Sequence, residues 1–285
     1  MAAITQRRAA RPAGPVLDLS GPRLRRAFNH LVGAAEPTGG VERYVSALAL
    51  KASLFEEILG KGKVRDMTAA EFGDLVAFAS PVRRRIAPYL EPDGFNRMRE
   101  RLAALLEGWS DVTTADARLL RFMAQFPQDK GHRWVRDLGA EVLHFIAPEH
   151  YPLMTRWVWD ARVGTGVLRE IWYSDLVDDA VIDVDDGFET FVALTAELST
   201  FLTASGVFRD HAFYADLLCA HVYAGYINDR GGQYLRSDFS DGTDPMTHTR
   251  RMLGLDTINT ETGRTRLKLI DGSAHVLGGA PLMAN

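Results

Sequence analysis

The sequence reads Lys130-Gly-His-Arg-Trp-Val-Arg136, then Thr155-Arg-Trp-Val-Trp-Asp160 and Glu170-Ile-Trp-Tyr173, within one stretch that spans residues 130–173. This stretch holds four of the five tryptophans and three of the eight histidines of the chain. Burying a tryptophan removes more apolar surface from water than burying most other side chains does. We therefore expect residues 130–173 to form the centre of the core.

Within this stretch, residues 134–147 are predicted to form an amphipathic helix that Pro148 ends. Glu141 lies on the apolar face, and His144 follows it three residues later. Glu-x-x-His is a ligand motif of carboxylate-bridged di-iron bundles, which need a second copy and two further glutamates. The sequence has no second copy. We therefore expect no metal and no other cofactor, and a buried Glu141 carboxylate that is hydrogen-bonded to a neighbour.

The composition is typical of a soluble globular protein. The chain has 285 residues, of which 46% are hydrophobic and 25% charged, and a formal net charge of -4. No run approaches the roughly 20 apolar residues of a membrane span, so no membrane association is expected. Cys219 is the single cysteine, which excludes an intramolecular disulfide and fits a reducing cytoplasm. The net charge argues against nucleic-acid binding driven by overall charge.

Most of the chain predicts helices. Ser20 and Pro22 mark a helix start, Thr68-Ala-Ala-Glu71 is a capping box, and apolar residues recur at helical spacing. The same signals predict short helices at 81–90 and 95–106, separated by a turn at 91–94. Residues 257–270 predict a small β-hairpin that turns at Thr262-Gly263. The expected fold class is mainly α, a multi-helix globular domain with a small C-terminal β-hairpin.

The domain organisation follows from shifts in composition. Residues 1–16 carry Arg7, Arg8 and Arg11 with no acid, which is typical of a disordered basic tail. Residues 17–285 are expected to form one helical domain, and a subdivision near 110–128 stays open. From residue 229 onward, glycine and polar residues replace the helical pattern, so the C-terminal part, 229–285, is expected to be irregular.

One segment resembles the helix-hairpin-helix DNA glycosylases. In that family a small-residue helix is followed by an apolar-Pro-apolar-apolar-Asp-x-x-Val turn that presents the catalytic aspartate. Gly139-Ala140 followed by Tyr151-Pro-Leu-Met-Thr-Arg-Trp-Val158 is similar, over about a tenth of the chain. Thr155 stands at the aspartate position, and Gln128-Asp-Lys-Gly-His132 departs from the family's glycine-rich hairpin. The resemblance implies a nucleic-acid-binding protein with a glycosylase-like core that lacks the catalytic aspartate.

The segment from Glu170 to Glu189 is strongly acidic. It contains eight aspartates and glutamates and no lysine or arginine. The spacing does not fit a calcium loop, because Ile182 falls at the first ligand position. The segment is expected to be either a solvated loop or a docking surface for a basic partner, with nearby aromatic side chains as apolar anchors. The candidate partner-binding residues are Trp172, Tyr173, Asp175, Asp178, Asp179, Asp183 and Asp185.

A second set of residues could line a pocket. His221 lies on the apolar face of a predicted helix, where a core histidine satisfied by a hydrogen bond is the simplest interpretation. Loops such as 231–238 often carry function because the scaffold positions them. The loop Arg162-Val-Gly-Thr-Gly166 lacks the third glycine of a dinucleotide-binding motif. The candidate pocket residues are Glu141, His144, Arg156, Trp157, His221, Tyr234 and Arg236.

Three functional hypotheses remain open from the sequence. The first is a cytoplasmic accessory or regulatory protein that binds another protein through charged and aromatic surfaces. The second is a nucleic-acid-binding protein with the glycosylase-like core. The third is an enzyme with a site near Glu141, His144 and the 231–238 loop. A protein partner is the leading expectation, nucleic acid is the alternative, and the oligomeric state is not predicted.

Overall fold

The computed structural model describes residues 15–174, 181–230, 244–257 and 264–276, and these residues are mainly helical. Residues 20–174 carry the helices α1 (Gly21–Ala35), α2 (Val41–Leu59), α3 (Ala69–Ala77), α4 (Pro92–Leu106), α5 (Ala115–Ala124), α6 (Trp134–Ile146) and α7 (Val167–Glu170). Later in the chain follow α8 (Phe188–Ala204), α9 (His211–Arg230), α11 (Thr247–Met252) and the strands β1 (Arg264–Lys268) and β2 (Ala274–Val276). The expected mainly α fold with a small C-terminal hairpin is confirmed.

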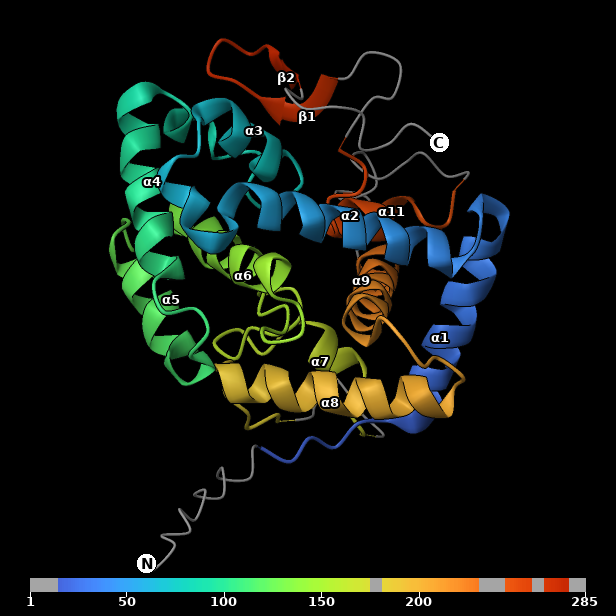
Figure 1. Ribbon diagram of the computed structural model, residues 1–285. Helices are drawn as coiled ribbons and strands as arrows, with labels where there is room; N and C mark the ends of the chain where they lie inside the picture. The colour runs from blue at the N-terminus through green and yellow to red at the C-terminus, as the bar shows by residue number, and fades with distance from the viewer. Residues whose placement is uncertain (1–14, 175–180, 231–243, 258–263, 277–285) are drawn as a thin grey trace, which may run out of the picture.

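The longer helices form a frame around two inner helices. In Figure 1, α4 and α5 lie on one side, α2 runs across the upper part below the β-strands, α1 closes the other side and α8 runs along the bottom. α6 and α9 lie inside this frame. Among the described helices, none is long and apolar enough to cross a membrane.

Local signals explain where several helices begin. The Thr68 hydroxyl accepts a hydrogen bond from the Glu71 N–H at 3.2 Å, and the Glu71 carboxylate accepts one from the Thr68 N–H at 2.7 Å. The capping box predicted at the start of α3 is thus confirmed. α8 is capped from outside the helix, because the Asp116 carboxylate accepts the Phe188 N–H at 2.9 Å.

The helix predicted over residues 81–90 is not present. Residues 81–85 are turns, followed by a short 3-10 helix, η3 (Ala87–Tyr89). Pro88 explains this, since it has no N–H to donate and disfavours the helical conformation of the residue before it. The next helix starts earlier than predicted, with Pro92 in its first turn, so 91–94 belongs to the start of α4 instead of a separating turn.

Most of the tryptophans of residues 130–173 belong to the core, which also includes residues from most other parts of the described chain. Trp134, Trp157 and Trp159 are buried, and Trp172 is half-buried against the core. α6 packs on α2 and α5, and α9 packs on α1, α2, α8 and α11. Each fully buried large apolar side chain contributes roughly 1.5–3 kcal/mol of transfer free energy, so the contacts of these inner helices with their neighbours stabilise the fold.

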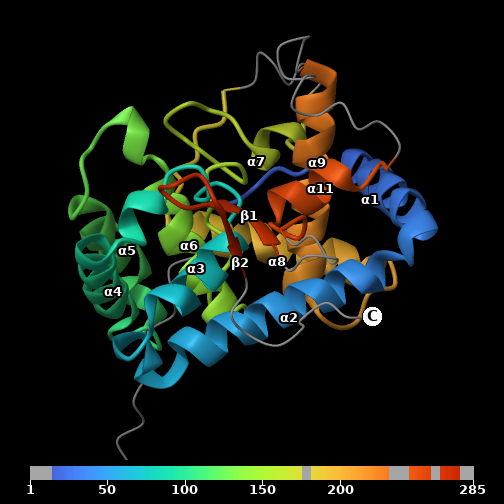
Figure 2. The ribbon, with the colours of Figure 1, turned by 90° about the horizontal axis from the view of Figure 1, so that it is seen from above.

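The C-terminal hairpin lies further along the chain than predicted, with its turn at residues 269–273. β1 pairs antiparallel with β2, and the Leu269 N–H donates to the Ser273 carbonyl at 3.0 Å across the turn. The predicted turn at Thr262-Gly263 lies outside the described residues. The hairpin packs on α3, where His275 Nε2 lies 2.7 Å from Asp74 Oδ1. Seen from above, it lies over α3 (Figure 2).

We predict that Gly254→Ala destabilises the protein. Gly254 has a φ of +74°, and an added Cβ would lie 1.8 Å from the Phe78 carbonyl oxygen, so the segment after α11 would have to move. The left-handed backbone alone costs roughly 1–3 kcal/mol for a residue other than glycine. Urea unfolding should therefore show a free energy lower by about 2 kcal/mol or more.

Gly225→Ala is the matched control, because a Cβ there on α9 meets nothing within 4 Å. Alanine is the better helix former by up to about 1 kcal/mol, so this variant should be as stable as the wild type or more stable. If Gly254→Ala and Gly225→Ala were equally stable, the close contact of Gly254 with the Phe78 carbonyl would be contradicted.

Candidate functional site

Glu141 and His144 point into the protein interior from α6. Both side chains are buried, as is Lys51, which reaches them from α2. Lys51 Nζ donates to Glu141 Oε2 at 2.8 Å and to the Leu253 carbonyl at 3.0 Å. It also lies 3.9 Å from the centre of the Phe145 ring, within the range of a cation–π interaction. The expected buried, hydrogen-bonded Glu141 is confirmed, and its partner is a lysine from 90 residues earlier in the chain.

His144 holds the second buried ion pair. Its Nδ1 lies 2.7 Å from the Tyr151 carbonyl oxygen, and its Nε2 lies 2.8 Å from Asp216 Oδ2. Both partners are acceptors, so satisfying both bonds requires an N–H on each ring nitrogen, which is the charged imidazolium form. Burial acts to lower the pKa of His144, but the Asp216 carboxylate and these hydrogen bonds outweigh it and raise that pKa.

The two pairs form an ionic cluster, defined here as Lys51, Glu141, His144 and Asp216. Burial lowers the pKa of Lys51 and raises the pKa of Glu141, and the attraction between them opposes both shifts. Each of these two buried groups is therefore stabilised in its charged form by its partner. Within the described residues, no group of three or more histidine, cysteine or acidic side chains is arranged to hold a metal ion.

The other predicted pocket residues do not all gather around Glu141. His221 shares a hydrogen bond of 2.7 Å with His30 and is 3.0 Å from the Thr249 hydroxyl, and burial lowers its pKa to about 4. It is a core histidine with hydrogen-bond partners, as predicted. Arg156 and Trp157 lie on the segment that follows α6. Tyr234 and Arg236 fall outside the described residues.

The segment after α6 is anchored by polar contacts. Arg156 forms an ion pair with the buried Asp137 at 2.6 Å, and its own backbone N–H donates to the same carboxylate at 3.0 Å. The Trp159 indole N–H donates to the Val184 and Asp185 carbonyls, both at 3.1 Å. Within the described part of the chain, the buried Thr155 hydroxyl and the Trp157 indole N–H have no hydrogen-bond partner. This anchoring fixes the tight turn at 160–165.

A basic pocket lies between the α5–α6 connection and this turn. Its volume is about 690 Å³. Its apolar wall includes Leu120, Met123, Phe126, Val135 and Val163, and its charged residues are Asp129, Lys130, His132, Arg133, Arg136, Arg156, Asp160, Arg162 and Asp186. Arg156 is the one sequence-predicted pocket residue that lines it. The other lining residues are not predicted from the sequence, although Lys130, Arg133 and Arg136 stand close together in the chain.

The cations of the basic pocket fall into two groups. Arg136 is paired with Asp186, and Arg156 is paired with Asp137. Lys130, Arg133 and Arg162 are exposed and have no ion pair with any described residue. Leu120 and Val163 beside them are 64% and 57% exposed. The pocket therefore offers three cations without an ion pair, in excess of the nearby Asp129 and Asp160, next to exposed apolar surface. This combination suits an anion that also has an apolar part.

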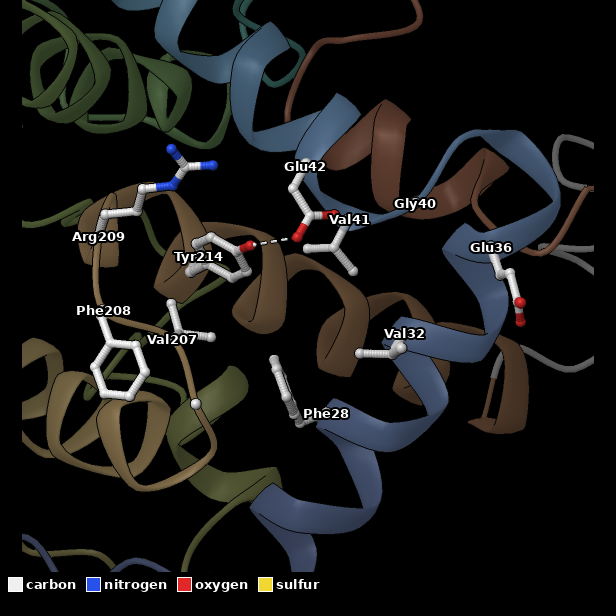
Figure 3. A pocket seen from close by; sticks show the side chains of 11 residues that line it. Phe28, Val32, Glu36, Gly40, Val41, Glu42, Val207, Phe208, Arg209 and Tyr214 are labelled. Atoms are coloured by element: carbon white, nitrogen blue, oxygen red, sulfur yellow. Dashed lines mark hydrogen bonds between the residues drawn. The ribbon is translucent and has the colours of Figure 1, made fainter.

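A second pocket is apolar. It lies between the end of α1, the start of α2 and the α8–α9 connection, with a volume of about 630 Å³ (Figure 3). We call it the apolar pocket, and it is lined by Phe28, Val32, Glu36, Gly40, Val41, Glu42, Gly206, Val207, Phe208, Arg209 and Tyr214. The Tyr214 hydroxyl donates to Glu42 Oε1 at 3.2 Å.

The predicted partner-binding stretch is only partly described. Tyr173 and Asp183 are exposed, and Trp172 is half-buried. Asp185 accepts hydrogen bonds from the Thr190 hydroxyl at 2.7 Å and the Gly187 N–H at 3.0 Å, so it stabilises the start of α8. Asp175, Asp178 and Asp179 fall outside the described residues. Docking at this stretch stays a prediction.

No known protein family, no characterised protein and no solved structure matches this chain. The resemblance to the helix-hairpin-helix glycosylases therefore stays a prediction from the residues alone.

We predict that the buried Lys51–Glu141 pair is strongly coupled. Lys51→Met or Glu141→Leu alone should lower the free energy of unfolding by about 3–5 kcal/mol, because each leaves an unpaired buried charge. The double variant should lose less than either single variant. Urea unfolding of the four proteins measures this. Glu57→Leu on the exposed side of α2 is the control and should change little; additive effects of the two buried substitutions would contradict the coupling.

We predict a pH-dependent role for His144. Its pKa is raised in the folded protein, so its pairing with Asp216 stabilises fully below the unfolded pKa of about 6.5 and is lost as the pH rises through the folded pKa. The stability difference between the wild type and Asp216→Asn should therefore be larger at pH 6 than at pH 9. Urea unfolding at both pH values tests this, and a difference that grows with pH would contradict it.

Proposed function

We propose that this protein binds nucleic acid through its phosphate groups at the basic pocket. The observation that carries the proposal is the set of three exposed cations without ion-pair partners among the described residues: Lys130, Arg133 and Arg162. Neighbouring Arg136 and Arg156 are neutralised by acids, so these three are available to an external anion. Lysine and arginine bind the phosphate backbone by neutralising its charge.

The shape and chemistry of the pocket favour a nucleic acid over a small inorganic anion. The three cations come from two separate segments, the start of α6 and the 160–165 turn, so they can contact more than one phosphate. The exposed Leu120 and Val163 can cover an apolar base or sugar surface. The N-terminal end of α6, which no side chain caps, adds partial positive charge.

The protein would bind nucleic acid without catalysing the glycosylase reaction. Thr155 stands where the resemblance would place a catalytic aspartate, and its side chain is buried. Its hydroxyl cannot carry the negative charge that an aspartate would supply. Because the overall net charge is -4, only the basic pocket is expected to attract nucleic acid. The affinity for nucleic acid should therefore depend strongly on salt.

The test compares two triple variants with the same change in charge. Lys130→Gln/Arg133→Gln/Arg162→Gln removes the three cations, and Arg25→Gln/Arg26→Gln/Arg97→Gln removes three exposed arginines from α1 and α4. Binding of a fluorescein-labelled oligonucleotide, single-stranded or duplex, is measured by fluorescence anisotropy at several salt concentrations.

We expect the first variant to bind about tenfold more weakly or worse. Its plot of log affinity against log salt should be shallower by up to about 3, which is one unit for each phosphate that the variant no longer neutralises. The second variant should behave like the wild type. Equal effects in both variants, or no binding by the wild type at low salt, would reject the proposal.

A further inference from the structure

Several apolar side chains that line the apolar pocket are exposed to solvent. Phe208 is 78% exposed and Val32 is 44% exposed, and they stand on opposite walls, on the α8–α9 connection and on α1. Phe28, Val41 and Val207 lie between them (Figure 3). Exposed apolar side chains at the walls of a pocket are a feature of interaction sites.

The charges at the rim are unbalanced. Glu36 and Glu42 line the pocket and have no ion pair with any described residue. Arg209, on the other wall, lies 3.8 Å from its neighbour Asp210, which offsets its charge. The pocket therefore presents an apolar floor with net negative charge beside it, the opposite of the basic pocket.

We propose that the apolar pocket docks a basic amphipathic segment of a partner protein. An apolar side chain of that segment enters between Phe28 and Val207. One basic residue next to it pairs with Glu42, and a second one further along the segment pairs with Glu36, which lies at the other end of the pocket (Figure 3). The Tyr214 hydroxyl, 3.2 Å from the Glu42 carboxylate, holds that carboxylate at the pocket.

The exposure of the walls favours a polypeptide over a small molecule. A small molecule inside the pocket would cover only the parts of Phe208 and Val32 that face it, whereas a segment lying across the pocket can cover more of both side chains. Aromatic side chains are frequent hot spots of protein interfaces, and charges at the rim mainly set the association rate and the choice of partner. This inference is independent of the proposed nucleic-acid binding, because it uses none of the same residues.

The experiment is a selection with a random 12-residue peptide library displayed on phage, with the full-length wild type as the target. The pocket variant Phe208→Ser/Glu36→Gln/Glu42→Gln serves for counter-selection, and all three positions are exposed, so it should fold. Glu57→Gln/Glu197→Gln is a charge-matched control away from the pocket. Enriched peptides are then synthesised, labelled and titrated by fluorescence anisotropy.

We expect enriched peptides that combine apolar and basic residues, and that bind the pocket variant at least about tenfold more weakly while binding the control like the wild type. Peptides without basic residues, peptides that bind all proteins equally, or no enrichment would overturn the proposal. If peptides were enriched only on a target with the substitutions Arg7→Gln/Arg8→Gln/Arg11→Gln, the occupant of the pocket would instead be the chain's own residues 1–16. Thermal stabilisation by phenethylamine without any enriched peptide would assign it to a small organic amine.

Discussion

The interior of this protein depends on two ion pairs that share one helix. Glu141 and His144 are three residues apart on α6, and they bind Lys51 of α2 and Asp216 of α9. A buried charge without a partner costs several kcal/mol, so a shift of any of these helices along its neighbour would be strongly penalised. Lys51 also donates to the Leu253 carbonyl just after α11, which ties the C-terminal part to the same point. The helical frame is thus held in one arrangement by charge as well as by apolar packing.

The charged side chains that stabilise the interior are separate from those that can bind a ligand at the surface. The ionic cluster in the centre of the fold is paired and hydrogen-bonded, whereas Lys130, Arg133 and Arg162 lie at the surface and have no ion pair with a described residue. The buried pairs restrict the movement of the helices, and these rigid helices let short connections present Lys130, Arg133 and Arg162. Binding residues on connections positioned by a rigid scaffold are a common arrangement. The two pockets differ in charge, so they suit ligands of opposite sign.

Much of the secondary structure is determined locally. The capping box at Thr68, the prolines at the starts of α1 and α4 and the apolar stripe of α6 each act within a few residues, and the helices begin close to where these signals stand. The prediction was wrong at 81–90, where Pro88 interrupts the helix and Arg83 turns inward to pair with Asp256 at 2.7 Å. That pair joins residues 173 positions apart, which no local pattern can indicate.

The sequence by itself determined the mainly α fold class, the amphipathic helix α6 and the burial of Glu141, because hydrophobic periodicity and capping depend only on neighbouring residues. The tertiary structure decided which charges are neutralised. Arg133 and Arg136 are indistinguishable by composition, yet Asp186 lies beside Arg136 and no described acid pairs with Arg133. Lys51 likewise looks like a surface lysine of an amphipathic helix until α6 packs against it. Ion pairing depends on distances of a few ångströms between segments far apart in the chain, and those distances exist only in the folded protein.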